Sequence, residues 1–243
     1  MASVASPKLF KDNPKNVVLP NTLGTINLLN FASTMNLKSF IFFSTTGVNG
    51  FVDDEIRPIS ENEYGGLDST KLENCYLESK RMGENLCIAW HAQDNVPIQI
   101  VRPAITYGPG VPLEDGRSYA DFINSIVKNK NIVLYSKGKA IRNFCYIADF
   151  IIGLFHVIFK GKIGEVYNVS SELEHSIKQA ALMLTEDIFK DQNLSVEFDF
   201  GSNNDLRPEF NRTTVSTKKV RDLGWESYFS FKAGMKRTVE SYL

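Results

Sequence analysis

Two short runs rich in apolar residues, one on either side of a long segment with helical periodicity, constrain the fold most. The runs SFIFFST (39–45) and PIQIVRP (97–103) have the composition of buried strands in a parallel sheet. Between them, residues 74–93 have the pattern of a helix. A strand, a helix and a second strand in this order predict an α/β fold on a parallel sheet. Ligands of such sheets bind at the carboxyl ends of the strands.

Upstream, apolar residues recur at helical spacing over residues 16–35, which predicts one helix, strained near Pro20. Residues 47–73 are rich in Gly, Asp, Glu and Asn and are interpreted as a long loop, and residues 105–110 as a tight turn. The remaining expected elements are helices at 118–129, 146–160, 175–190, 216–222 and 230–242, and extended segments at 131–136, 164–170 and 195–200.

Composition excludes several classes of function. The 243-residue chain has a formal net charge of −1, which is unlike the basic footprint of a nucleic-acid-binding protein. Its three cysteines and three histidines lack metal-ligand or disulfide spacing, so we expect no metal site and a reducing, cytoplasmic environment. No apolar run approaches the roughly 18 residues of a membrane span, and the first residues do not resemble a signal peptide.

One pair of residues carries candidate chemistry. Tyr76 and Lys80 are spaced i, i+4 in the predicted helix 74–93, so both side chains lie on one face. A nearby ammonium is expected to lower the pKa of a tyrosine, which is otherwise near 10. Tyr76 could then take a proton from a sugar hydroxyl. Thr45, at the end of the strand 39–45, could hydrogen-bond the same oxygen. The spacing alone is a weak signal, and its strength lies in the surrounding strand–loop–helix–strand order.

With these segments in place, the sequence resembles the extended short-chain dehydrogenase/reductases of the NAD-dependent epimerase/dehydratase family. The segments that carry the resemblance are NTLGTINLL (21–29), FIFFSTTGVNG (40–50), CYLESKRMGENL (75–86), IVRPAITYGPG (100–110), IRNFCYIADF (141–150), EVYNVS (165–170) and LGW (223–225). The resemblance spans essentially the whole chain and implies NAD as cofactor.

The resemblance also implies roles for individual residues. Tyr76 would be the catalytic base and acid, Lys80 would bind the nicotinamide ribose and tune Tyr76, and Thr45 would hold the substrate hydroxyl. Asn21 matches a family asparagine near the cofactor, and we assign Ser44, next to Thr45, to the cofactor as well.

For the substrate, Thr46 joins Thr45 in our assignment. Arg142 matches an arginine that grips the diphosphate of a nucleotide sugar of the UDP or dTDP type, a task that suits a planar guanidinium. Arg207 or Arg212 matches a second nucleotide contact.

The sequence lacks the Gly-x-x-Gly-x-x-Gly turn with which the family binds the cofactor pyrophosphate. We therefore expect an incomplete Rossmann-type parallel sheet, with roughly 80 residues of the usual dinucleotide-binding half outside this chain. Residues 1–103 would form the carboxyl-terminal part of the NAD-binding domain. Residues 104–243 would form a smaller mixed α/β substrate-binding lobe, with 164–170 returning to the main sheet. Weak or no NAD binding is expected, which calorimetric titration would test.

Departures from the family bear on the reaction. Family 4,6-dehydratases carry an Asp-Glu pair after the catalytic threonine, where this chain has Thr46 and Gly47, and sugar-acid decarboxylases carry a glutamate at the position of Gly47. A 4-epimerase needs neither carboxylate, so 4-epimerisation is slightly favoured. Asn49 replaces a usual tyrosine, and Ile105 occupies a position that is often polar. Against the epimerase, CYLESKRMGENL is closer to the dehydratase and decarboxylase branch.

Two further interpretations stay open. A non-catalytic scaffold or interaction protein would keep the fold without the reaction, and the missing Gly-rich turn motivates that reading. Family members also often dimerise through two helices from each subunit, which here predicts a homodimer through helices 16–35 and 74–93.

Overall fold

A three-stranded parallel sheet forms the centre of the computed structural model. The structure describes residues 5–6, 8–53, 55–201 and 214–243. The sheet consists of β1 (Phe40–Phe43), β2 (Ile98–Pro103) and β6 (Glu165–Val169), in the order β1-β2-β6. β1 and β2 are the two apolar runs identified in the sequence, and they pair in parallel. The predicted α/β class with a parallel sheet is confirmed.

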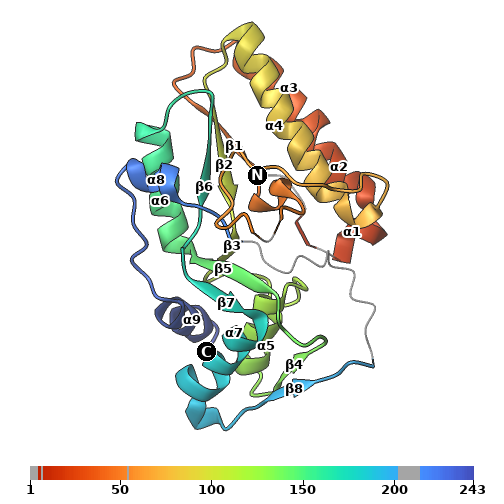
Figure 1. The fold of residues 1–243 in the computed structure, drawn as a ribbon, viewed down its shortest axis with the longest axis vertical. Helices are drawn as coiled ribbons and strands as arrows, with labels where there is room; N and C mark the ends of the chain where they lie inside the picture. Colours follow the sequence, from red (N-terminus) through yellow and green to blue (C-terminus); the bar gives the residue numbers. More distant parts are fainter. Residues whose placement is uncertain (1–4, 7, 54, 202–213) are drawn as a thin grey trace.

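Helices cover both faces of this sheet (Figure 1). α2 (Pro14–Asn21), α3 (Leu23–Ser33) and α4 (Cys75–Asp94) lie together on one face, and α6 (Ile147–Lys160) and α8 (Lys218–Asp222) lie on the other. This three-layer arrangement is expected for strands that are apolar on both sides.

The single helix predicted over residues 16–35 is wrong in one respect, because the structure divides it at Thr22. Thr22 departs from helical geometry, with φ −109° and ψ −79°, and its N–H bonds to the carbonyls of Val18 and Leu19. Pro20 lies within α2, where it lacks the N–H that an α-helical bond requires. The break therefore follows the strain that Pro20 predicts.

A second group of strands forms the lower part of Figure 1. β3 (Ile105–Tyr107) pairs in parallel with β5 (Ile141–Tyr146), which pairs antiparallel with β7 (Glu174–Ser176). β4 (Ile132–Leu134) and β8 (Val196–Phe198) form a two-stranded parallel sheet. The helices of this part are α5 (Ser118–Val127), α7 (Ile177–Leu182) and α9 (Phe231–Glu240), and a π-helix (Met183–Ile188) follows α7.

Two element predictions in this part are corrected. The tight turn expected over 105–110 begins as strand β3, because the chain continues to pair beyond β2 before Gly110 turns it with φ +83°. The helix expected over 175–190 is preceded by β7 and changes to a π-helix at Met183.

Gly83 sets how closely α4 approaches the sheet. A Cβ at this position would collide with the ring of Phe42 on β1 and would lie 3.1 Å from the Asn21 carbonyl oxygen. The absence of a side chain at Gly83 therefore lets α2, α4 and β1 meet at one point.

The two edges of the main sheet differ in chemistry. At the β6 edge, the Asn168 N–H donates to Glu61 Oε1 at 2.8 Å, and Lys219 pairs with Glu165 at 2.6 Å. β1 has the sequence FIFF, and among the described residues it pairs with β2 alone. Charged groups bond the β6 edge, and at the end of β1 the Lys80 ammonium donates to the Phe43 carbonyl oxygen at 2.7 Å.

A buried aspartate on α6 anchors the segment of the chain that precedes α9. Asp149, in the first turn of α6, is fully buried, and its carboxylate accepts hydrogen bonds from the Ser227 hydroxyl and from the N–H groups of Tyr228 and Phe229. The Trp225 indole N–H donates to the Asp149 carbonyl at 2.9 Å. One side chain thus fixes the segment that leads into α9.

Candidate active site

The site begins where β1 ends. Ser44 is buried, and its Oγ has no hydrogen-bond partner within the described part of the chain. Thr45 is extended, with φ −157° and ψ 149°, and its Oγ1 accepts from the Gly47 N–H at 3.3 Å. Thr45 thereby caps a short 3-10 helix, Thr46–Asn49, in which Thr46 is half-buried. The strand end delivers its hydroxyls as the sequence predicted.

α4 brings Tyr76 and Lys80 to the same strand end. Lys80 is 5% exposed, and its Nζ donates to the Phe43 carbonyl oxygen at 2.7 Å. The same Nζ lies 5.2 Å from the centroid of the Phe42 ring and 5.9 Å from that of the Tyr76 ring. The predicted pairing of Tyr76 and Lys80 on one helix face is therefore present, with the ammonium anchored to the backbone of β1.

Burial dominates the electrostatics of this pair. Desolvation lowers the pKa of Lys80 from 10.5 to about 8, which the charges of Cys87 and Glu84 only partly oppose. Desolvation likewise raises the pKa of Tyr76, and the positive charge of Arg117 partly opposes that rise. The expectation that Lys80 would lower the pKa of Tyr76 is therefore wrong for this structure, because loss of water outweighs the neighbouring charge.

The amino-terminal segment contributes to the desolvation of Tyr76. The Phe10 ring stacks on the Tyr76 ring, with centroids 5.3 Å apart and planes 10° apart. The Ser6 hydroxyl donates to the Asp115 carbonyl oxygen at 2.7 Å, so the same segment also reaches the loop before α5. Phe10 is a site neighbour that sequence reasoning missed, and its separation from Tyr76 along the chain left no local signal.

Arg117 is a second neighbour that the sequence did not reveal. It precedes α5, forms an ion pair with Asp115, and lies with its guanidinium carbon 5.1 Å from the Tyr119 ring centroid. Its positive charge interacts with Tyr76, so a cation beside α5 contributes to the electrostatics of the site. An arginine in a polar loop carries no pattern that would have distinguished it from a solvated one.

Asn21 has a packing contact at the base of the site. It is 2% exposed, and its Nδ2 donates to the Val17 carbonyl and to Ser79 Oγ, both at 3.0 Å. Ser79 precedes Lys80, so Asn21 holds α2 against the part of α4 that carries the lysine. The proposed contact of Asn21 with a cofactor remains a prediction.

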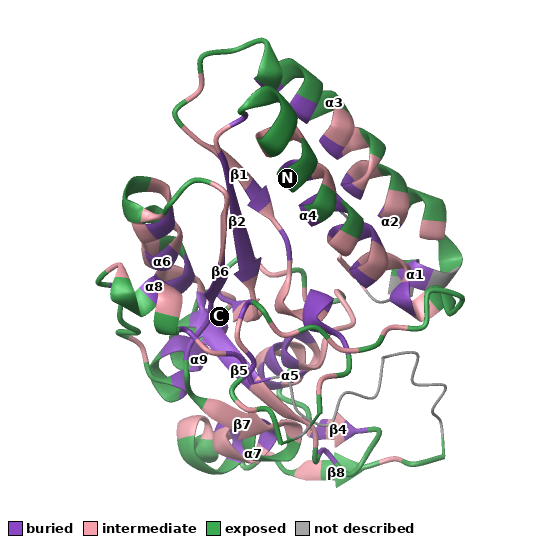
Figure 2. Cartoon of the chain, turned by 45° about the horizontal axis from the view of Figure 1, so that its top comes forward, coloured by how far each residue is buried: buried purple, intermediate pink, exposed green. Residues whose placement is uncertain are grey.

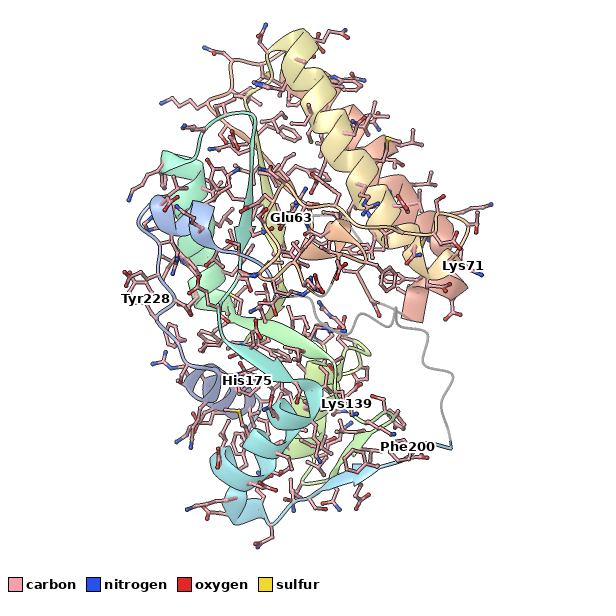
Figure 3. All side chains as sticks on the ribbon, in the orientation of Figure 1. Glu63, Lys71, Lys139, His175, Phe200 and Tyr228 are labelled. Carbon is pink, nitrogen blue, oxygen red and sulfur yellow. The ribbon has the colours of Figure 1, made fainter. Side chains whose placement is uncertain are left out.

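Beneath the site lies a buried ionic network that sequence reasoning also missed. Arg102 on β2 is fully buried and binds Glu84 with two hydrogen bonds, 2.7 Å from Nε to Oε1 and 2.6 Å from Nη2 to Oε2. It also donates to the Glu61 carbonyl at 2.9 Å and to the Tyr64 hydroxyl at 2.7 Å. Figure 3 labels Glu63 in the same loop, beside the strands of the main sheet. An arginine inside a strand whose other residues are apolar except for Gln99 was the available signal.

The predicted substrate arginines lie elsewhere. Arg142 is half-buried on β5, opposite His175 on β7, and its Nη1 donates to the Ile141 carbonyl at 2.8 Å. Figure 3 labels His175 and Lys139 in this lower part of the molecule. Arg207 and Arg212 lie outside the described residues.

The residues at the end of β1 fit the hydroxyl-rich part of a dinucleotide. A buried serine oxygen without a partner, such as that of Ser44, is uncommon, because burying a hydroxyl that makes no hydrogen bond costs free energy. The Lys80 ammonium has three N–H donors, of which the Phe43 carbonyl takes one. Ser44 and Lys80 can therefore hold ribose hydroxyls. In the described part of the chain, no cluster of His, Cys, Asp and Glu is arranged to hold a metal ion.

Fold and site together define a Rossmann-type α/β protein with a tyrosine–lysine pair at the carboxyl end of its sheet. The chain belongs to the NAD dependent epimerase/dehydratase family, whose family model matches residues 1–170.

Relatives and solved structures agree with this assignment. The chain is 28% identical over 242 residues to UDP-glucuronic acid decarboxylase 1 of Xenopus tropicalis, covering 100% of this chain and 55% of that protein. UDP-glucuronic acid decarboxylase 3 of Arabidopsis thaliana is 29% identical, with 100% and 68% covered. The chain therefore spans about half to two-thirds of the length of these relatives.

Among solved structures, the UDP-glucose 4-epimerase of Thermotoga maritima with UDP-glucose is similar, with a TM-score of 0.86 at 22% identity over 100% of this chain and 75% of that one. The dTDP-glucose 4,6-dehydratase of Streptomyces venezuelae, solved with NAD, has a TM-score of 0.81 at 22% identity, with 100% and 71% covered. At these identities the likeness shows the fold.

Within the described ranges, no helix is both long enough and apolar enough to cross a membrane.

Proposed function

We propose that this chain takes part in the NAD-dependent modification of a UDP- or dTDP-linked sugar by transient oxidation at C4. The observation that carries the proposal lies at the end of β1. Lys80, one helical turn from Tyr76, places its buried ammonium on the Phe43 carbonyl, and the next residue, Ser44, has a buried hydroxyl without a described partner. Family membership supports the choice of cofactor.

In this proposal each side chain has a distinct task. Bound NAD supplies the hydride acceptor and donor. As the phenolate, the Tyr76 oxygen would take the proton from the sugar O4 hydroxyl and later return it, while Thr45 Oγ1 orients the same hydroxyl; the site must therefore favour the phenolate against the burial that raises the pKa of Tyr76. Lys80 and Ser44 hold ribose hydroxyls, and Arg142 binds the substrate diphosphate through its planar guanidinium.

Among the possible outcomes, 4-epimerisation is favoured. The turn Thr45–Asn49 has the sequence TTGVN and carries no carboxylate. Removal of the C5 proton, which a 4,6-dehydratase requires, would therefore lack a base on this turn. An epimerase needs only Tyr76 for proton transfer, because the hydride leaves and returns at the same carbon.

Sugar-acid decarboxylation is a second candidate, favoured by a different observation. The curated relatives named above are UDP-glucuronic acid decarboxylases, and the chain aligns with them over its full length. Their activity fits the same C4 oxidation, followed by loss of carbon dioxide from C5, protonation of C5 and return of the hydride to C4.

One assay separates these reactions. The protein is incubated with NAD and either UDP-glucose or UDP-glucuronic acid, and products are followed by NMR. A 4-epimer supports epimerisation, and UDP-pentose with released carbon dioxide supports decarboxylation. Tyr76→Phe is expected to abolish turnover, whereas Tyr228→Phe, a change at a tyrosine that is 65% exposed, should leave it intact. Turnover that survives Tyr76→Phe would overturn the assigned role.

A non-catalytic scaffold stays as the alternative of another class. It is favoured if the protein binds no nucleotide sugar by calorimetry, yet unfolds cooperatively; weak NAD binding is expected on either reading and does not separate them.

We further propose a homodimer through α2, α3 and α4. The apolar side chains exposed on these helices are Leu19, Leu23, Leu28, Phe31, Met82 and Ile88. Figure 2 shows exposed residues along the outer sides of α3 and α4. Exposed apolar side chains on three helices that pack together are typical of an interface. Light scattering should give twice the 27.4 kDa chain mass. Phe31→Glu should reduce it to one chain, and Phe159→Glu, on α6, should not.

A further inference from the structure

The turn that carries Thr45 touches α4 at one point, where Gly47 faces Leu77. A Cβ on Gly47 would lie 2.6 Å from Leu77 Cδ2 and 3.6 Å from Thr45 Oγ1. The first distance is too short for two carbon atoms, and the second is ordinary contact. A side chain at position 47 would therefore start in the space that Leu77 fills, beside the hydroxyl of Thr45.

Space, and not backbone conformation, is what restricts position 47. Other glycines of the chain, such as Gly50 with φ +70°, have a backbone that disfavours a side chain, but Gly47 is not among them. The colliding atom, Cδ2, is the outer end of the Leu77 side chain, and because Leu77 is 8% exposed and follows Tyr76 on α4, its neighbours limit how far that end can move. The chain thus combines the smallest residue at position 47 with a large apolar residue next to the tyrosine.

We propose that Leu77 is a specificity-determining residue, which fills the place beside Thr45 where a side chain at position 47 would project and so keeps ionisable groups off this turn. The inference rests on the function proposed above. Thr45, Thr46, Gly47, Val48 and Asn49 have no ionisable side chain, and Leu77 closes the gap with an apolar contact.

This contact limits the reaction to one carbon atom. When C4 is oxidised, a hydride leaves C4, the O4–H bond breaks, and Tyr76 holds the proton. Return of the hydride and the proton restores the alcohol, so atoms and electrons balance with C5 untouched. Breaking the C5–H bond requires a second base. The turn has no such base, because Leu77 fills the space that an ionisable side chain at position 47 would need.

The packing half of the proposal is tested without turnover, by thermal unfolding of single and double variants. Overpacking costs on the order of 1–3 kcal/mol, which lowers the Tm of a domain this size by roughly 2–10 °C, so Gly47→Ala should show such a drop. In a Leu77→Ala background the same change should cost less than about 1 °C, because the colliding atom is gone. Gly66→Ala is the matched control, since a Cβ there meets nothing within 4 Å. Equal costs of Gly47→Ala in both backgrounds would overturn the proposal.

The chemical half uses solvent isotope. The protein is incubated with NAD and UDP-glucose in deuterium oxide, and the recovered sugars are analysed by NMR. Wild type should return sugars without deuterium at C5, and Gly47→Glu combined with Leu77→Ala should introduce deuterium there. Deuterium at C5 from the wild type would contradict the proposal while leaving C4 oxidation in place. Absence of any turnover would count against the proposed function itself, and the packing variants then decide the role of Leu77.

Discussion

Replacing Lys80 by methionine should stabilise the protein at neutral pH. The ammonium is buried at the end of β1, where its described polar contact is the Phe43 carbonyl oxygen. Desolvation lowers its pKa from 10.5 to about 8, which means that folding works against the charged form. Methionine keeps the length and apolar character of the stem and removes the charge.

The magnitude follows from linkage. A depression from 10.5 to about 8 corresponds to at most roughly 3 kcal/mol at about 1.4 kcal/mol per pKa unit. Loss of the hydrogen bond to the Phe43 carbonyl offsets part of this gain. We therefore expect Lys80→Met to raise the free energy of unfolding by about 1–3 kcal/mol at pH 7. Because the folded pKa lies below the unfolded one, wild-type stability should rise with pH between about 8 and 10.5. The advantage of the variant should therefore shrink to less than about 1 kcal/mol at pH 10.

Urea unfolding of both proteins at pH 7 and pH 10 measures this difference. With an m-value of about 2–3 kcal/mol/M, the midpoint at pH 7 should rise by about 0.3–1.5 M. Lys71→Met, a change at an exposed lysine labelled in Figure 3, is the control. It should change the free energy of unfolding by less than about 0.5 kcal/mol. A variant that is less stable than wild type at pH 7, or an advantage that does not change with pH, would refute the reasoning.

Three further changes test the packing around the site, each by urea unfolding. Arg102→Met should cost about 3–5 kcal/mol, because it leaves the Glu84 carboxylate buried without its partner; adding Glu84→Leu should recover most of that loss, and no recovery would contradict the account. Gly83→Ala should cost about 1–3 kcal/mol through collision with Phe42, and an unchanged midpoint would show that α4 can shift. Asp149→Ala should cost about 2–4 kcal/mol by removing the acceptor of three hydrogen bonds, and a loss below about 1 kcal/mol would mean that water replaces it.

The main sheet was predictable because its strands are rich in apolar residues. β1 is a continuous hydrophobic run, β2 places apolar residues around Gln99 and Arg102, and α4 has a long helical period, so local pattern and fold agree. β5 was missed because IRNFCY mixes polar and apolar residues and precedes a stronger helical signal. β3 was read as a turn because the following glycines dominate that stretch of sequence.

For the site, the sequence predicted the spacing of Tyr76 and Lys80 but not the surroundings of the two side chains. The i, i+4 pair of Tyr76 and Lys80 follows from helix geometry alone. Its electrostatics depend on Phe10 and Arg117, which approach from distant segments, and on burial, which raises the pKa of Tyr76. Sequence could suggest a charge beside the tyrosine, but it could not show how much water tertiary packing removes.

The edge of β1 that no described strand covers carries its own reporter. The N–H groups of Phe40 and Ser44 donate to the carbonyls of Pro97 and Val101 on the β2 side, so the alternating N–H groups of Ile41 and Phe43 point the other way. In amide hydrogen exchange these two positions should exchange quickly inside an otherwise slow sheet. Any strand that adds to this edge would slow both at once, so the two amides would record the arrival of a partner before any change in activity could be measured.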